Sequence, residues 1–247
     1  MPTEGSLSFR FQPLVAWRAM SKLLADGEDT KQAFYIAEAL RGGSAKANFN
    51  RFRTSPVGAA VLAERRILLD RLCDRATLSA LPTDTLGRAY HDFLARENLT
   101  AEGLVEASKH TERADASPDV RLFFDRSRDT HDLSHVVTGY GRDGLGEISL
   151  LAFAYAQSGN HGLGFISLIA MAKVAREVPN LPIRAAVWEG YRNGRAARRF
   201  NEADWEALLS EPLEAVRARL NIRPPLRYRA IMDAVRAHAA EQSLQAA

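Results

Sequence analysis

Cysteine is nearly absent from this sequence of 247 residues, in which Cys73 is the single example. One cysteine excludes an intramolecular disulfide, and such scarcity is typical of a reducing compartment. Cys73 lies in an apolar run, and its neighbours offer no obvious cation that would stabilise a thiolate. We therefore predict a buried structural cysteine rather than a catalytic thiol.

Long hydrophobic runs are also missing. The most apolar stretch, residues 148–175, is interrupted by polar residues at 157–161. Neither half is therefore long enough to span a bilayer. Residues 1–6 show no charged segment leading into an apolar run, so we expect no secretory signal. These absences predict a cytoplasmic protein.

An excess of charge of one sign is lacking as well. The 33 Lys and Arg residues stand against 30 Asp and Glu residues, which gives a net charge of +3. So small a surplus does not indicate a nucleic-acid partner. Hydrophobic residues make up 46% of the chain and charged residues 26%, which excludes a collagen-like or disordered protein.

Alternating strand patterns are scarce, whereas helical spacing of apolar residues recurs along the chain. We predict an all-α protein: one multi-helix domain over residues 1–247, with about eight to ten helices. The ordered core should cover about residues 10–240, with frayed ends. Proline at a first helical turn predicts one helix from Ser55-Pro56 through Leu72, and another from Ser117-Pro118 to Val137.

The segment 129–147 carries the strongest chemical signal. His131 and His135 stand four residues apart, so on a helix they project from one face and can converge on a cation. Asp132 lies at the edge of that face, where it can ligate a metal or orient a ligand imidazole. Tyr140, a few residues later, is a candidate to reach the same place.

Four glycines at positions 139–146 end this helix and predict a turn that reverses the chain. Glu147 follows in the opening turns of the next helix, so its carboxylate can return toward the histidines. Two imidazoles with one or two carboxylates suit Zn²⁺, Mn²⁺ or Fe²⁺. The plainer alternative is a pair of surface histidines, which the glycine-rich return to Glu147 makes less attractive.

Other polar and apolar groups are weaker candidates. We interpret His91-Asp92 and His110 as structural, and His161 as a turn residue or a residue that supports the ligands of the site. The apolar segments 150–154 and 165–171 predict either ordinary core or a channel for an apolar ligand. An arginine cluster predicts a solvated face or a binding site for anions; its members are Arg184, Arg192, Arg195, Arg198 and Arg199.

The pattern His131-Asp132-x-x-His135, followed after eleven residues by Glu147, resembles a signature of a known family. This is the family of the fourth Coq protein of ubiquinone (coenzyme Q) biosynthesis, and the likeness is to its bacterial homologues. The segments 128–133, 189–197 and 204–217 resemble the family too. The similarity runs with gaps from about Pro13 to Ile222 and is weakest before Ser55.

The resemblance implies an all-helical protein that associates peripherally with the inner face of the membrane. It implies a divalent metal, usually described as zinc, with His131, Asp132, His135 and Glu147 as ligands and catalytic residues. The implied reaction removes the carboxylate at C1 of a polyprenylated 4-hydroxybenzoate and supports hydroxylation there. The expected partners are that substrate, other ubiquinone biosynthesis proteins and a second copy of the chain in a homodimer.

Two other functions stay open at this point. One is a non-catalytic scaffold subunit that binds polyprenyl lipids. The other is an HD-type metal phosphohydrolase, which also places adjacent His and Asp on a helix. That class normally needs a further upstream histidine and a distant downstream aspartate. The second histidine four residues on and the glycine-rich return fit that class poorly.

Overall fold

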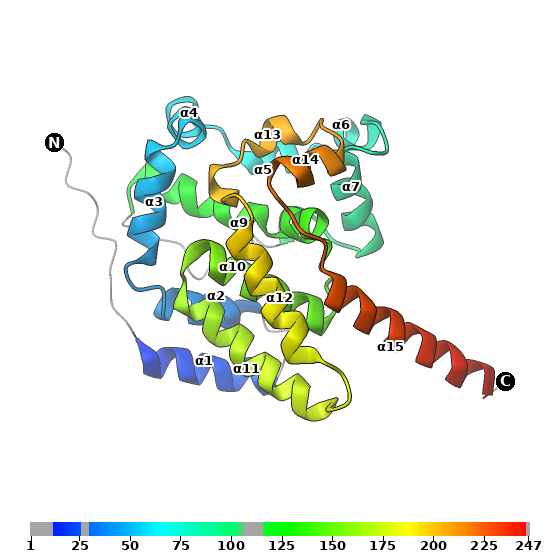
Figure 1. The fold of residues 1–247 in the computed structure, drawn as a ribbon. Helices are drawn as coiled ribbons and strands as arrows, with labels where there is room; N and C mark the ends of the chain where they lie inside the picture. Colours follow the sequence, from blue (N-terminus) through cyan, green and yellow to red (C-terminus); the bar gives the residue numbers. More distant parts are fainter. Residues whose placement is uncertain (1–11, 26–29, 104, 106–115, 246–247) are drawn as a thin grey trace.

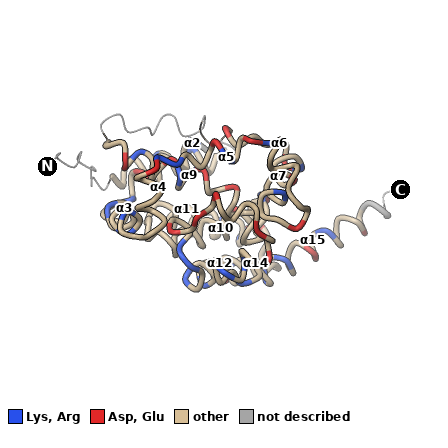
Figure 2. The backbone as a smooth tube through the Cα atoms, turned by 90° about the horizontal axis from the view of Figure 1, so that it is seen from above, with Lys and Arg blue, Asp and Glu red and all other residues tan. Residues whose placement is uncertain are grey.

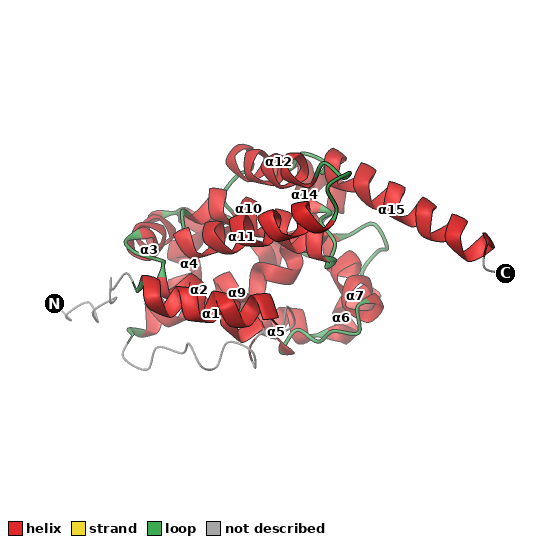
Figure 3. Cartoon of the chain, turned by 90° about the horizontal axis from the view of Figure 1, so that it is seen from below, coloured by secondary structure: helices red, strands yellow, loops and turns green. Residues whose placement is uncertain are grey.

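The computed structural model describes residues 12–25, 30–103, 105 and 116–245, and all regular elements among them are helices (Figure 3). Within this part of the chain, pairing of strand type is limited to one isolated bridge between Thr85 and Pro212. The predicted all-α fold is confirmed. That the helices form one domain stays a prediction.

The chain has more helices than hydrophobic periodicity predicts. The described residues contain fourteen α-helices and one 3-10 helix, η2. Short helices account for the difference, because one or two turns do not establish a periodic pattern. In chain order the elements are α1 (Pro13–Ala25), α2 (Thr30–Ala39), α3 (Ser44–Thr54), α4 (Pro56–Glu64), α5 (Leu68–Cys73), α6 (Arg75–Ala80), α7 (Leu86–Arg96), α9 (Pro118–Thr138), α10 (Gly144–Ser158), α11 (His161–Glu177), α12 (Ile183–Ala196), η2 (Phe200–Glu202), α13 (Trp205–Leu208), α14 (Leu213–Arg219) and α15 (Leu226–Gln245).

Proline marks two helix starts as predicted, but one predicted helix is wrong in length. Ser117 caps α9 by accepting a hydrogen bond from the Val120 amide, and α9 continues without a break to Thr138. The helix predicted from Ser55-Pro56 to Leu72 instead ends at Glu64. Arg65 there adopts the left-handed conformation with φ 54°, which stops a helix of L-residues.

The functional segment, residues 129–147, lies on α9 and α10, and neighbouring helices hold both of them in place. α10 packs against α11 and α12, while α7 and α3 pack against α9 (Figure 1). α1 and α2 pack together and lie on α11. The side chains of α9 enter two hydrophobic clusters, since Leu133 and Val137 join the largest one and Phe123 joins a smaller one with Phe52 and Val61. α9 is therefore held along its whole length.

A buried ion pair fixes α9 to the segment that contains α13. Arg126 donates to both carboxylate oxygens of Glu206, at 2.5 Å and 2.7 Å, and also to the Ala203 carbonyl at 3.2 Å. The Arg126 side chain is 3% exposed and that of Glu206 is 11% exposed. A two-pronged pair of this kind favours a single orientation of the two elements.

The last helix, α15, leaves the body of the protein and points away from it (Figure 1). Its first turns are anchored by the buried side chains of Tyr228 and Ile231. Lys and Arg segments are interspersed with Asp and Glu segments along much of the chain (Figure 2). Across the described residues, none of the helices combines the length and apolar character required to cross a membrane.

Candidate metal centre

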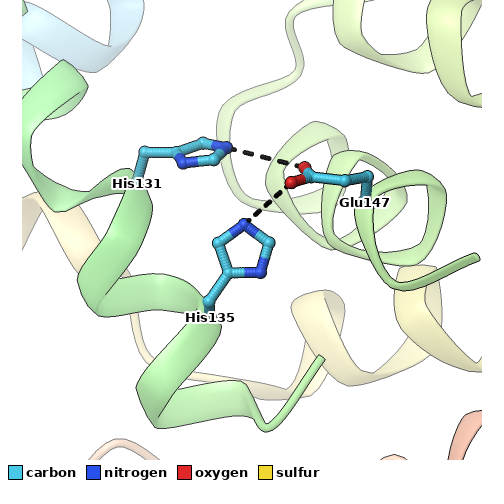
Figure 4. Close-up of side chains that lie close together, drawn as sticks. All are labelled: His131, His135 and Glu147. Carbon is cyan, nitrogen blue, oxygen red and sulfur yellow. Dashed lines mark ion pairs between the residues drawn. The ribbon is translucent and has the colours of Figure 1, made fainter. Parts of the chain in front are cut away.

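Three side chains from two helices converge as the sequence predicts. His131 and His135 lie one turn apart on α9, and both rings face Glu147 at the start of α10 (Figure 4). His135 Nε2 lies 3.3 Å from Glu147 Oε1, and His131 Nε2 lies 3.9 Å from Oε2. One ligand atom from each residue lies within 4.8 Å of the others, which is compact enough for one metal ion.

The second nitrogen of each imidazole fixes which nitrogen faces the centre. His135 Nδ1 lies 3.0 Å from the Tyr140 carbonyl oxygen, which only accepts hydrogen bonds. His131 Nδ1 lies 3.1 Å from Asp132 Oδ1, also an acceptor. We assign the ring proton to Nδ1 in both residues, because each then donates to its partner. Both Nε2 lone pairs are thus directed at the centre, as metal ligation requires.

The environment of His135 supports this assignment. Its side chain is 0% exposed and stacks on Phe93 of α7, with ring centroids 5.8 Å apart. His135 Nε2 is buried and makes no hydrogen bond. A buried polar atom without a partner costs about 1–3 kcal/mol. A lone pair facing a carboxylate is also repulsive, and a cation between the two groups removes both penalties, so the residues fit a bound metal.

The backbone of the turn explains how Glu147 reaches the histidines. Gly139 adopts the left-handed conformation with φ 77°, and its amide donates to the His135 carbonyl at 2.8 Å, which ends α9. Asp143 caps α10 by accepting from the amides of Leu145 and Gly146. A Cβ atom on Gly146 would lie 2.1 Å from the Gly141 carbonyl oxygen, so this close approach requires glycine.

A residue distant in sequence completes the turn. Tyr228 of α15 donates a short hydrogen bond to the Asp143 carboxylate, and its hydroxyl accepts from the Gly141 amide at 2.9 Å. Burial and the contact with Asp143 raise the pKa of Tyr228, so its hydroxyl stays a neutral donor. Tyr228 and Phe93 were not predicted from the sequence, because nothing local to either residue indicates contact with the 129–147 segment.

Asp132 has a different place from the other three predicted ligands. Its side chain is 8% exposed and its carboxylate meets His131 Nδ1, outside the group of three that could share an ion. Of the two roles that the sequence left open, this geometry favours orientation of His131 over direct ligation. The side chain of Tyr140 takes a hydrogen bond from Asn193, so it is the Tyr140 backbone that meets the site.

When a proton takes the place of the metal on an imidazole, that imidazole and the Glu147 carboxylate stabilise each other. Although burial opposes the charged imidazole, the hydrogen bond with Asp132 and the charge of Glu147 raise the pKa of His131 above its ordinary value. Although burial also opposes ionisation of Glu147, its contact with His135 and the nearby charges of His131 and Arg142 hold the pKa of Glu147 below its usual range. Glu147 is therefore an anion at neutral pH.

Metal affinity should depend on pH through His131. Protons compete with a metal for Nε2, and the raised pKa of His131 starts this competition above the ordinary histidine value of about 6.5. In the metal-free protein, the stabilising effect of protonated His131 is lost as pH rises through its raised pKa. We expect the rise in unfolding temperature caused by excess Zn²⁺ to grow from pH 5 to pH 8, and a flat profile would contradict histidine ligation.

Substituting Asp132 tests its role in orientation. Asp132→Asn keeps an acceptor for His131 Nδ1 but removes the negative charge. We expect metal affinity to fall by about 10- to 100-fold, the usual cost of losing an outer-shell partner. Equilibrium titration with a metal-sensitive dye measures this. Complete loss of binding would instead identify Asp132 as a direct ligand.

A large cavity lies beside the cluster. It has a volume of about 1350 Å³, and His131, Asp132 and Glu147 form part of its wall. The predicted apolar segments contribute in part, through Leu150, Leu151, Phe153 and Ala154 of α10 and Ile166 and Ala170 of α11. Much of the remaining wall is apolar and comes from other helices, including Met20, Leu23, Phe34, Phe52, Phe123 and Phe124.

The other sequence candidates do not join the cluster. His91 pairs with Asp92 on α7, and His161 is exposed at the start of α11. Cys73 is partly buried, and burial raises the pKa of its thiol to about 11, which disfavours a reactive thiolate. His110 lies outside the described residues. All members of the arginine cluster are exposed, and Arg199 also lines the cavity.

Two proteins with sequences similar to this chain are ubiquinone biosynthesis proteins. The chain is 32% identical over 180 residues to the mitochondrial "Ubiquinone biosynthesis protein COQ4 homolog" of Danio rerio, covering 71% of this chain and 63% of the relative. It is 27% identical over 178 residues to the coq4 protein of Botryotinia fuckeliana, covering 72% of this chain and 61% of the relative. The chain thus spans somewhat less than two thirds of these relatives.

This chain is also similar to a solved structure in its fold and to a family profile in its sequence. A putative ubiquinone biosynthesis protein from Nostoc punctiforme has the same fold, with a TM-score of 0.62 and 22% identity, over 85% of this chain and 98% of that chain. Residues 20–226 match the profile of the family described as "Coenzyme Q (ubiquinone) biosynthesis protein Coq4". That match covers most of the sequence and includes the whole His131–Glu147 cluster, so this chain belongs to the Coq4 family of ubiquinone biosynthesis proteins.

Proposed function

We propose that this protein is a metal-dependent enzyme of ubiquinone biosynthesis that removes the C1 carboxylate of a polyprenylated 4-hydroxybenzoate, with hydroxylation at C1. The observation that carries the proposal is the position of the cluster. His131 and Glu147 stand on the wall of an apolar cavity of about 1350 Å³. That arrangement suits a substrate with a polar ring and a long apolar tail.

His131, His135 and Glu147 would hold the metal, with Asp132 keeping the His131 ring in place. Three ligands leave coordination positions open, as in catalytic rather than structural sites. When bound, a dication supplies Lewis acidity next to the reacting carboxylate. Zinc suits the donor set, while manganese and iron are alternatives; iron(II) is the better match if dioxygen takes part directly.

The chain itself contributes binding of the substrate's apolar tail. Apolar side chains of α10 and α11 accept the prenyl tail, which sets the ring against the cluster. Burial of each methylene group contributes about 0.8 kcal/mol of binding free energy, so the tail anchors the substrate.

Overall, the carboxylated ring and one oxygen atom give the hydroxylated ring and CO₂. This is a two-electron oxidation, so an oxidant such as dioxygen must be supplied.

Peripheral contact with the membrane belongs to the same proposal, since the substrate is a lipid. α1 exposes Leu14 and Trp17, at 73% and 61%, and carries Arg18 and Lys22 but no acidic residue. Exposed apolar and basic side chains on one helix suit an anionic membrane surface. Other ubiquinone biosynthesis proteins and a second copy of the chain are the proposed protein partners.

The second candidate is a scaffold subunit that binds polyprenyl lipids without catalysis. The cavity favours it as strongly as it favours an enzyme. An HD-type phosphohydrolase is not favoured, because the group gathered from the described residues consists of two histidines and a glutamate. Release of phosphate from nucleotides would revive that alternative.

The test combines metal analysis with turnover. Purified wild-type protein and His135→Ala are analysed for bound metal, with His91→Ala as a control on a histidine outside the cluster. We expect metal in wild type and His91→Ala only. Each protein is then loaded with Zn²⁺, Mn²⁺ or Fe²⁺ and given 3-geranyl-4-hydroxybenzoate labelled with ¹³C in its carboxylate.

Release of ¹³CO₂ by the metal-loaded wild type supports the enzyme. Tight binding of the labelled acid without ¹³CO₂ from any metal form, with dioxygen and a reductant present, favours the scaffold. Equal metal content in His135→Ala and wild type would overturn the metal centre.

A further inference from the structure

We propose that Arg142 binds the carboxylate of the substrate and makes the site selective for the acid over its decarboxylated product. The inference rests on the proposed function, because it takes an aromatic carboxylate as the ligand. It adds a side chain of the protein that recognises that carboxylate.

Arg142 lies in the turn between α9 and α10, five positions before Glu147. It lines the same cavity as His131, Asp132 and Glu147. The turn is held by Gly146 against Gly141 and by Tyr228, so the backbone that carries Arg142 is fixed relative to the cluster.

Other arginines on the cavity wall have partners: Arg41 pairs with Glu38, Arg128 with Asp125, and Arg199 donates to the Gln157 carbonyl. Arg142 lines the same wall, but the structure gives it no hydrogen bond or ion pair with any described residue. A guanidinium so placed is available to an anionic ligand.

Carboxylate recognition is the chemistry that suits this group. A guanidinium can donate two parallel hydrogen bonds to one carboxylate, which fixes the orientation of the ligand. When the bond between C1 and the carboxylate breaks, its electron pair stays with the ring and CO₂ leaves uncharged. The contact with Arg142 is therefore strongest in the ground state. It tightens binding of the acid and favours release of the product, without accelerating the bond cleavage.

The experiment compares two probes that differ in the carboxylate alone. The dissociation constants of 3-geranyl-4-hydroxybenzoate and 2-geranylphenol are measured by calorimetry with the metal-loaded protein. Wild type, Arg142→Gln and Arg51→Gln are compared; Arg51 is a cavity arginine on α3, so its substitution lowers the cavity charge equally. The readout is the ratio of the two constants, which partial unfolding would not change because it weakens both probes alike.

We expect wild type and Arg51→Gln to prefer the acid, and Arg142→Gln to lose about 10- to 100-fold of that preference, the usual range for a charged hydrogen bond. In turnover, the loss should fall on KM rather than on kcat. An unchanged ratio in Arg142→Gln, or no preference in wild type, would overturn the inference. An Arg142-dependent preference without ¹³CO₂ release would support carboxylate binding here while contradicting the proposed reaction.

Discussion

Glu147→Gln is expected to lower the affinity for a divalent metal by more than about 100-fold and to reduce ¹³CO₂ release to below roughly 1% of wild type. Losing an outer-shell partner already costs about 10- to 100-fold, and Glu147 supplies the negative ligand itself. Glutamine has nearly the same shape, so the cavity and the turn should persist. Metal titration and turnover of the labelled acid measure the two effects.

The fold should tolerate this substitution. Glu147 lies in the first turn of α10, where a negative charge contributes about 0.3–1 kcal/mol through the helix dipole. Glu177→Gln is the matched control, because Glu177 is a second carboxylate on the cavity wall but comes from the end of α11. Retention of full metal affinity and activity by Glu147→Gln would refute the assigned centre, and loss in both variants would indicate a general effect of cavity charge.

Gly146→Ala is expected to destabilise the protein by about 1–3 kcal/mol and to weaken metal binding at the same time. The new Cβ would lie 2.1 Å from the Gly141 carbonyl oxygen, a backbone atom that cannot rotate away. The turn must open, which displaces Glu147 one residue later. For a chain of this size, the midpoint of thermal unfolding should fall by about 2–4 °C for each kcal/mol.

Gly144→Ala is the matched control for this prediction. A Cβ atom on Gly144 would meet nothing within 4 Å, and Gly144 lies in the same first turn of α10. Alanine there should be neutral or stabilising by up to about 1 kcal/mol, since glycine is unfavourable in a helix. Equal behaviour of the two variants in unfolding and metal titration would contradict the close packing of Gly146 on Gly141.

Much of the candidate site was predictable from sequence because its parts are local. His131 and His135 share a face of α9 by helical spacing alone, and the glycines before Glu147 predict the turn. The helix predicted from Ser55 to Leu72 failed because apolar spacing continues through Arg65, where the backbone becomes left-handed. The arginine at position 65 does not indicate a left-handed backbone, since a non-glycine residue rarely adopts this conformation.

The amino-acid sequence by itself determined the helical class, the pair of imidazoles on one helix and the carboxylate after the turn, because these follow from spacing within a few residues. Only the tertiary structure decided that the carboxylate faces both Nε2 atoms, since the angle of the turn depends on Tyr228 from α15 and on the packing of Gly146 against Gly141. Tertiary structure also built the cavity, whose wall combines α1, α2, α3, α9, α10, α11 and η2. Such a wall depends on contacts between segments far apart in the chain, and local patterns carry no information about them.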